Sequence, residues 1–182
     1  MTTTTESPVG TWALDPAHTE VGFTVRHIMS KVRGVFTDFD GSIVVGENGL
    51  ADAQASANIR LASVDTRSED RDNHLRSADF FAVDANPTMA FSSTNVKYNG
   101  GDQLVVSGDL TINGVTRSVD LDVEYLGQGG DPFGNNRIGF EATGEISRRD
   151  FGIDFNIPLE GDRMMIGDRI AIRITGEAVQ QS

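Results

Sequence analysis

The chain has 182 residues, of which 38% are hydrophobic and 23% charged, which is ordinary for one soluble globular domain with a full core. It contains no cysteine, and this excludes disulfides, thiolate nucleophiles and cysteine-based zinc sites. The formal net charge of −12 makes nucleic acid and an anionic membrane surface unfavourable partners.

The first residues lack the features of a secretory signal. Residues 1–10 form a Thr-rich polar tail with no basic region and no apolar run, and no later run approaches membrane-spanning length. We therefore expect a cytoplasmic protein with no stable membrane insertion, made of a flexible tail over 1–10 and a single domain over 11–182.

The first half of the domain is predicted to consist of strands. A short strand over 11–14 precedes a turn at Asp15-Pro16, and Val21, Phe23 and Val25 then alternate with polar residues. Such a period of two is typical of a strand with one dry face. Alternation continues less cleanly over 35–45, and the Gly-Glu-Asn-Gly sequence at 46–49 predicts a hairpin turn.

The next predicted strand has an unusually small dry face. Between residues 51 and 61 every second residue is apolar, and the first four are Ala51, Ala53, Ala55 and Ala57. Alanine is a poor strand former, and β-branched or aromatic residues normally fill this face. The space left beside it must be occupied by a helix, by bulky neighbours or by a ligand.

The segment 66–77 lacks the strand period and is strongly polar. Its Thr66-x-x-Glu69 start resembles a capping box, which predicts a short surface helix. We expect Leu75, Phe80 and Phe81 to pack this helix onto the sheet.

From Pro87 onward the pattern returns to strands, over 89–96, 104–112, 115–125, 138–146 and 170–174. Turns are predicted at 99–101 and at Asn113-Gly114, and a Gly-rich loop at 127–136. About eight one-sided strands in sequence-adjacent pairing form either a sandwich or an up-and-down barrel. The small residues favour a barrel with a cavity, so we predict an all-β, about eight-stranded antiparallel up-and-down barrel with one or two short helices.

The same alternation selects the residues that would line the cavity. Fourteen of them are apolar: Val21, Phe23, Val25, Ala53, Ala55, Ala57, Ile59, Phe91, Leu121, Val123, Phe140, Ala142, Ile170 and Ile172. His27 continues the dry face of the early strand, as a hydrogen-bonded wall residue or as an anchor for a ligand headgroup. Arg148, at a strand end, is either a contact for an anionic headgroup or half of an Arg–Asp tie across a loop.

The sequence carries no motif that indicates catalysis. His18, His27 and His74 do not have the spacing of metal ligands, and neither a Gly-x-Ser-x-Gly elbow nor a phosphate-binding loop is present. The many carboxylates fall on wet strand faces. We therefore expect a protein that is not an enzyme and that uses neither a metal nor a cofactor.

Several motifs together resemble the YceI-like family. They occur in the family's order over about residues 10 to 178: Asp15-Pro16-Ala17-His18-Thr19-Glu20-Val21-Gly22-Phe23-Thr24-Val25-Arg26-His27, Gly34-Val35-Phe36-x-x-Phe39-x-Gly41, Arg71-Asp72-x-His74-Leu75-x-Ser77-x-Asp79-Phe80-Phe81, Pro87-x-x-x-Phe91-x-Ser93, Gly108-x-Leu110-Thr111-Ile112-x-Gly114-Val115-Thr116 and Arg148-x-Asp150-Phe151-Gly152. Each motif alone is weak, whereas the ordered set is highly specific.

The resemblance implies a lipocalin-like barrel with a long hydrophobic tunnel, a polyisoprenoid, isoprenoid quinone or other long-chain lipid inside it, often a homodimer, and no catalysis. Many members of the family carry a secretory signal, whereas this sequence starts with a polar tail, so a cytoplasmic version is expected. The function predicted is carriage or storage of such a lipid. Two alternatives stay open: an enzyme acting in the same cavity with His27 or His74 as base, and a ligand-free, stress-related structural protein with a packed core.

Overall fold

The computed structural model describes residues 7–182, which form one continuous antiparallel sheet, one α-helix and four short 3-10 helices. The strands are β1 (Gly10–Leu14), β2 (Glu20–His27), β3 (Ser30–Phe36), β4 (Phe39–Val45), β5 (Ala53–Arg60), β6 (Val64–Asp65), β7 (Thr88–Tyr98), β8 (Gln103–Ile112), β9 (Val115–Gly130), β10 (Asn136–Ser147) and β11 (Ile166–Gln180). The helices are α1 (Glu69–Arg76), η1 (Pro16–His18), η2 (Gly49–Asp52), η3 (Leu61–Ser63) and η4 (Arg148–Phe151).

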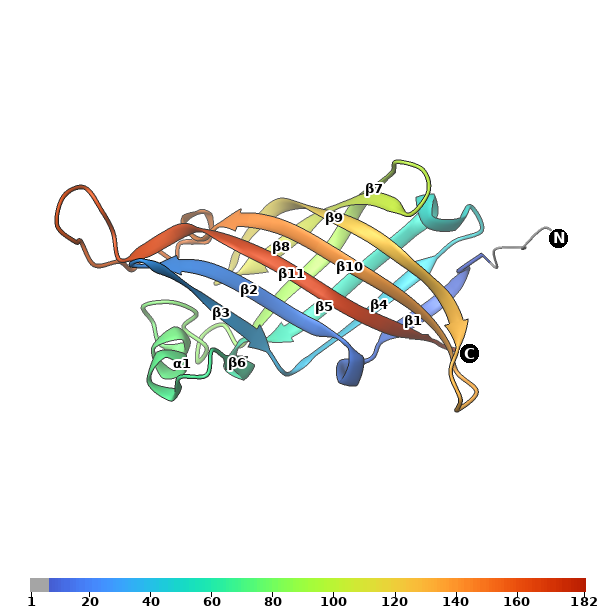
Figure 1. Ribbon diagram of the computed structural model, residues 1–182, viewed down its shortest axis with the longest axis horizontal. Helices are drawn as coiled ribbons and strands as arrows, with labels where there is room; N and C mark the ends of the chain where they lie inside the picture. Colours follow the sequence, from blue (N-terminus) through green and yellow to red (C-terminus); the bar gives the residue numbers. More distant parts are fainter. Residues whose placement is uncertain (1–6) are drawn as a thin grey trace.

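The strands close into an eight-stranded up-and-down barrel. β1 and β2 both pair with β11, so together they form one long barrel strand with a break in it. β4 pairs with β1 and β3 with β2, so β3 and β4 form the second broken strand. β5 pairs with β4 and β6 with β3, so β5 and β6 form the third. β7 to β11 follow in sequence order, and β11 closes the ring against β1 and β2 (Figure 1). The predicted lipocalin-like barrel is confirmed.

The breaks and element ends differ from the sequence prediction. The expected run over 35–45 is interrupted at Thr37, whose amide and hydroxyl bond to Ser63 instead of to a neighbouring strand. The alanine strand begins at Ala53, because Ala51 lies exposed in η2, and the predicted loop over 127–136 is shorter because β9 continues to Gly130.

The expected tail over 1–10 overlaps the folded part of the chain. Gly10 pairs with Val45 in the sheet, and the carbonyl of buried Pro8 accepts a hydrogen bond of 2.8 Å from the indole of Trp12. The folded part thus starts before the expected boundary, and residues 1–6 of the expected tail lie outside the described residues.

Helix α1 closes the barrel between β6 and β7, at the end that holds the β2–β3 turn (Figure 1). Its N-cap is Ser68, not the expected Thr66, which is buried and instead donates from its hydroxyl to Asp72 at 2.6 Å. Leu75 and Phe81 pack against the core, as expected. Within residues 7–182 no helix has the length and apolar character needed to cross a membrane.

Candidate ligand cavity

The barrel encloses a cavity of about 380 Å³ whose wall is almost entirely apolar. This volume lies in the usual range of small-molecule sites, about 300–1,000 Å³. Its lining includes His27 and Met165 near one end of the barrel and Tyr125 and Ile138 near the other. The cavity therefore extends along the barrel rather than forming a pocket at one end.

The structure brings all sixteen residues selected from the sequence to the wall of this cavity. Most of the apolar ones are only half-buried although they point inward, among them Phe23, Ala55, Val123 and Ile172. An inward-facing side chain in a packed core is fully buried, so this partial exposure shows that the interior holds space not filled by side chains.

The alanine strand widens the cavity. Ala53, Ala55 and Ala57 of β5 face inward and stand opposite Val45, Ile43 and Gly41 of β4. The smallest of these pairs, Ala57 with Gly41, leaves room that the side chain of Leu14 partly fills. The Cδ1 atom of Leu14 lies 2.7 Å from the position that a Cβ on Gly41 would take. The gap predicted from the sequence is therefore filled partly by a bulky neighbour and is otherwise cavity.

Two phenylalanine rings lie against glycines on adjacent strands. A Cβ built on Gly34 of β3 would come within 2.4 Å of the Phe23 ring, and one on Gly108 of β8 within 2.5 Å of the Phe91 ring. Each ring covers the backbone of a glycine, a device known to stabilise glycine in sheets. Both rings therefore lie close to the wall instead of crossing the cavity.

His27 and Arg148, the two polar residues selected from the sequence, share one end of the cavity. His27 pairs with Ile166 across β2 and β11, and the carbonyl of Ile166 accepts a long hydrogen bond of 3.4 Å from Arg148. The fold thus brings together two residues that are more than a hundred positions apart in the sequence.

Arg148 is 4% exposed and bonds to backbone carbonyls. Its guanidinium donates to the carbonyl oxygens of Gly167, Ile153 and Phe155 at 2.9, 2.9 and 2.8 Å, besides Ile166. Burial lowers the pKa of Arg148, and the nearby Asp168 opposes this effect. The tie predicted as an Arg–Asp pair is therefore made to main-chain carbonyls, and it holds the segment between η4 and β11 against the barrel. Four of the five guanidinium N–H groups are used in this way.

A second histidine, His74, lines the cavity from α1. The ring of His74 meets Phe80 and Phe155 edge-on, with centroids 4.9 Å away in each case, and its Nε2 lies 2.8 Å from Asp79. These aromatic contacts join α1, its following loop and the segment after η4 into one wall at this end.

The cavity is also lined by residues outside the sixteen predicted from the sequence. Examples are Val106 of β8 and Val96 of β7, which face the cavity as well. On β7 a bulge between Ser93 and Asn95 shifts the register, so Phe91 and Val96 both face inward in spite of their odd spacing. A strict period of two cannot identify such a pair.

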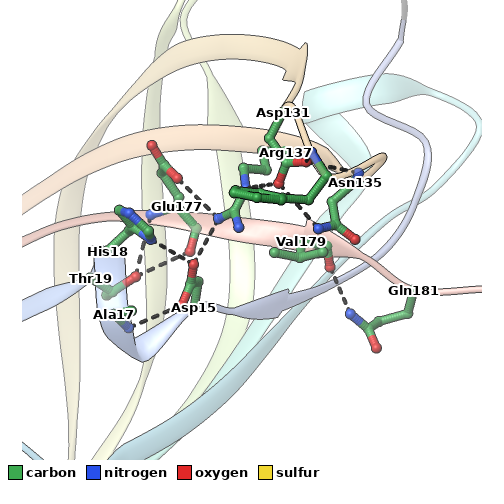
Figure 2. Close-up of polar contacts among 11 residues, drawn as sticks. Asp15, Ala17, His18, Thr19, Asp131, Asn135, Arg137, Glu177, Val179 and Gln181 are labelled. Carbon is green, nitrogen blue, oxygen red and sulfur yellow. Dashed lines mark hydrogen bonds and ion pairs between the residues drawn. The ribbon is translucent and has the colours of Figure 1, made fainter.

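At the other end, Arg137 fixes the break between β1 and β2 (Figure 2). Its guanidinium donates to Asp15 and Asp131 at 2.7 Å each and to Glu177 at 3.1 Å. Asp15 also caps η1 through the amide of Ala17. These bonds connect the break, the β9–β10 loop and the end of β11.

Arg137 holds the pKa of Asp131 well below its usual range, and Arg137, followed by His18, lowers the pKa of Asp15 to about 2. Oxygen and nitrogen atoms of Asp15, His18 and Glu177 lie within 4.8 Å of one another. Because Arg137 already pairs with both carboxylates, we assign this cluster to stabilisation of the fold.

Stability is therefore expected to fall as the pH drops from 4 towards 2. The depressed pKa of about 2 means that Asp15 stabilises the fold above its unfolded pKa and loses this contribution as the pH falls through about 2. Asp15→Asn is expected to lower the thermal midpoint by a few degrees at pH 7 and to flatten its decline between pH 4 and 2. Thermal unfolding followed by circular dichroism measures both effects. Asp109→Asn, an exposed carboxylate on β8, serves as control, and equal slopes in the two variants would contradict this role.

Comparison with known proteins places these features in one family. Residues 12–178 match the YceI-like domain. Protein YceI of Escherichia coli O157:H7 is 41% identical over 165 residues, which cover 90% of this chain and 83% of that protein. A crystal structure of the Campylobacter jejuni YceI protein is 33% identical, with a TM-score of 0.73 over 93% of this chain and 97% of that one.

A more distant structure shares the fold. It is described as a polyisoprenoid binding domain from Saccharophagus degradans, with a TM-score of 0.67 at 15% identity, and covers 95% of this chain and 99% of that one. The match over residues 12–178, the identity with YceI proteins and the shared barrel all agree, and the chain belongs to the YceI-like family.

Proposed function

We propose that this protein binds one long apolar molecule, a polyisoprenoid, an isoprenoid quinone or a similar lipid, and carries or stores it unchanged. The observation that carries this proposal is the apolar cavity along the barrel, whose inward-facing side chains are left partly exposed. The polyisoprenoid binding described for the Saccharophagus degradans domain supports it as an analogy of fold.

The proposed binding energy comes from apolar surface. Burial contributes about 25 cal/mol per Å², or roughly 0.8 kcal/mol per methylene group. The fourteen apolar residues selected from the sequence contact the chain of the lipid, and Ala55 lies among them. His27 and the remaining N–H group of Arg148 meet its polar end. The homodimer and the cytoplasmic location stay predictions.

An enzyme in the same cavity has less support. Within residues 7–182, neither the His27 ring nor the His74 ring has a hydrogen bond to a serine or threonine hydroxyl, and the Ser30 and Ser77 hydroxyls donate to the main chain of these histidines instead. Such a ring–hydroxyl pair is the signature of an activated nucleophile. A ligand-free packed core also fits poorly, because the barrel contains a cavity of about 380 Å³.

Native mass spectrometry of freshly purified protein tests the proposal. We expect a bound mass of lipid size, and for a series of alkyl chains added to emptied protein the Kd should fall about fourfold per methylene until the cavity is full. The same spectra give the oligomeric state. An empty chain with no chain-length dependence would support the packed core. Turnover of a lipid, lost in His27→Ala, would instead support an enzyme.

A further inference from the structure

An exposed apolar cluster surrounds the turn between β2 and β3. It consists of Ile28 and Met29 in the turn and Ile157 and Met164 in the segment before β11, which are 44%, 84%, 46% and 38% exposed. We call these four residues the tip cluster. The amide of Ile28 donates to the carbonyl of Met165 at 2.8 Å, and the amide of Met165 donates to Ile157 at 2.9 Å. The two loops are therefore joined through their main chains, which brings these four exposed residues close together.

The tip cluster lies at one end of the ligand cavity. His27 lines the cavity and is followed in the chain by Ile28 of the cluster. Met165 also lines the cavity and is preceded by Met164 of the cluster. In Figure 1 the β2–β3 turn and the loop before β11 form the left end of the barrel, opposite the two termini. An apolar patch at this position borders the end where His27 and Arg148 lie.

The hairpin beneath the tip cluster has a charge opposite to that of the whole protein. The β2–β3 hairpin contains Arg26, Lys31 and Arg33 and one acidic residue, Glu20, at the end of β2 away from the turn, although the chain carries −12 overall. All three basic residues are exposed, and Arg26 stands directly opposite Lys31 in the strand pair. Like charges in this position destabilise a hairpin. Within residues 7–182, none of the three forms an ion pair with a carboxylate, and Arg26 donates only to the carbonyls of Ile28 and Met164.

Protection of a strand edge explains only part of this arrangement. β3 pairs with β6 only through Val35 and Phe36, so Lys31 and Arg33 lie along an open edge, where charge discourages pairing with another chain. Edge protection gives no reason for exposing Met29 at the turn. The loop before β11 carries the acidic residues Glu160 and Asp162, so the positive charge at this end lies on the β2–β3 hairpin and not on that loop.

We propose that the tip cluster and the basic hairpin dock the protein on the surface of an anionic lipid bilayer. Apolar side chains ringed by Lys and Arg are the features of peripheral proteins, whose apolar part enters the headgroup region while the basic part meets anionic lipids. The overall charge of −12 disfavours such a surface, but only the charge within about a Debye length of it acts strongly. Docking at this end would place the cavity next to the bilayer, and this use rests on the lipid carriage proposed above.

Vesicle flotation measures the docking itself. The full chain is mixed with phosphatidylcholine vesicles that contain either no phosphatidylglycerol or a large fraction of it. We expect binding to the anionic vesicles only, and weaker binding at high salt.

Matched pairs of variants localise the contact. Met29→Glu is compared with Phe133→Glu, because Phe133 is 86% exposed on the β9–β10 loop at the opposite end. Lys31→Glu is compared with Lys97→Glu, the same charge change on the other lysine of the chain. We expect the partition coefficient to fall about fivefold or more in the two tip variants, since each unit charge near an anionic surface contributes about that factor and Met29→Glu also removes an apolar side chain. The two controls should bind as the unaltered protein does.

The absence of cysteine allows a second, independent measurement. Met29→Cys and Phe133→Cys each introduce a single thiol for an environment-sensitive fluorophore. The emission of the label at 29 should shift to the blue when anionic vesicles are added, and that of the label at 133 should not.

The outcomes separate docking from ligand binding. Equal binding to neutral and anionic vesicles, or equal loss in a tip variant and its control, would overturn the docking proposal whatever lipid the mass spectra show. A dimer in sedimentation that Met29→Glu dissociates would assign the tip cluster to a second copy of the chain and overturn it too. An empty cavity with intact vesicle binding would overturn the lipid carriage and leave the docking standing.

Discussion

We expect the substitution Ala55→Trp to abolish lipid uptake while the barrel stays folded. Ala55 faces the cavity from the middle of β5, opposite Ile43, and its side chain is not fully buried. An indole there enters open space rather than a packed core, so the cost in stability is small. It takes the room of about five methylene groups of the ligand, worth about 4 kcal/mol, or roughly a thousandfold in Kd. Native mass spectrometry and titration with a fluorescent lipid measure the loss.

The matched control is Ala171→Trp. Ala171 lies exposed in the middle of β11, where its side chain points away from the cavity. Circular dichroism and the thermal midpoint must show that both variants fold. Unchanged co-purification of lipid with Ala55→Trp would show that the ligand does not occupy the cavity, and equal loss in both variants would point to a general effect on the barrel.

The inner face of the barrel was predictable because the sheet is antiparallel and one-sided. Alternation fixes which side chains face inward without any knowledge of pairing, and for this reason residues as distant as Val21, Leu121 and Ile172 meet around one cavity. The breaks at Thr37 and at Leu61 depend on contacts between neighbouring strands, such as the bonds from Thr37 to Ser63. No local pattern records such contacts, so these two breaks could not be predicted, whereas Asp15-Pro16 marked the break between β1 and β2 in the sequence.

The chemistry of the cavity end was less predictable than its position. The alternation predicts that His27 faces the cavity, and the strand end suggests Arg148, but the sequence allows two roles for each residue. The partners of Arg148 are carbonyls of residues 153, 155, 166 and 167, and these have no side-chain signature in the sequence. A buried arginine held by the main chain is therefore invisible to motif analysis. Residue types alone suggest a carboxylate as the partner of Arg148, whereas its actual partners are main-chain carbonyls.

The contact between Phe23 and Gly34 makes the second large prediction, that Gly34→Ala narrows the cavity. The added methyl would lie 2.4 Å from Cζ of Phe23 and 2.9 Å from Cγ2 of the buried Thr66, so the ring must turn away from the wall. Displacing a packed ring costs about 1–3 kcal/mol of unfolding free energy. The ring also enters space used by the ligand, and we expect at least about tenfold weaker lipid binding.

Two further variants isolate the ring as the cause. Gly139→Ala on β10 is the matched control, because its methyl would lie at an ordinary 3.5 Å from Leu126 and Gly139 does not line the cavity, so we expect little change in either measurement. Phe23→Leu combined with Gly34→Ala should recover part of the stability and binding lost by Gly34→Ala alone, since the smaller side chain leaves room for the methyl. Denaturant unfolding and lipid titration of the unaltered protein, Gly34→Ala, Phe23→Leu and the double variant give the coupling energy of the pair, which should exceed about 0.5 kcal/mol. If the effects of Phe23→Leu and Gly34→Ala on stability and binding were strictly additive, the two residues would act independently, although they stand opposite each other in the sheet. That result would contradict the idea that the position of the Phe23 ring sets the width of the cavity.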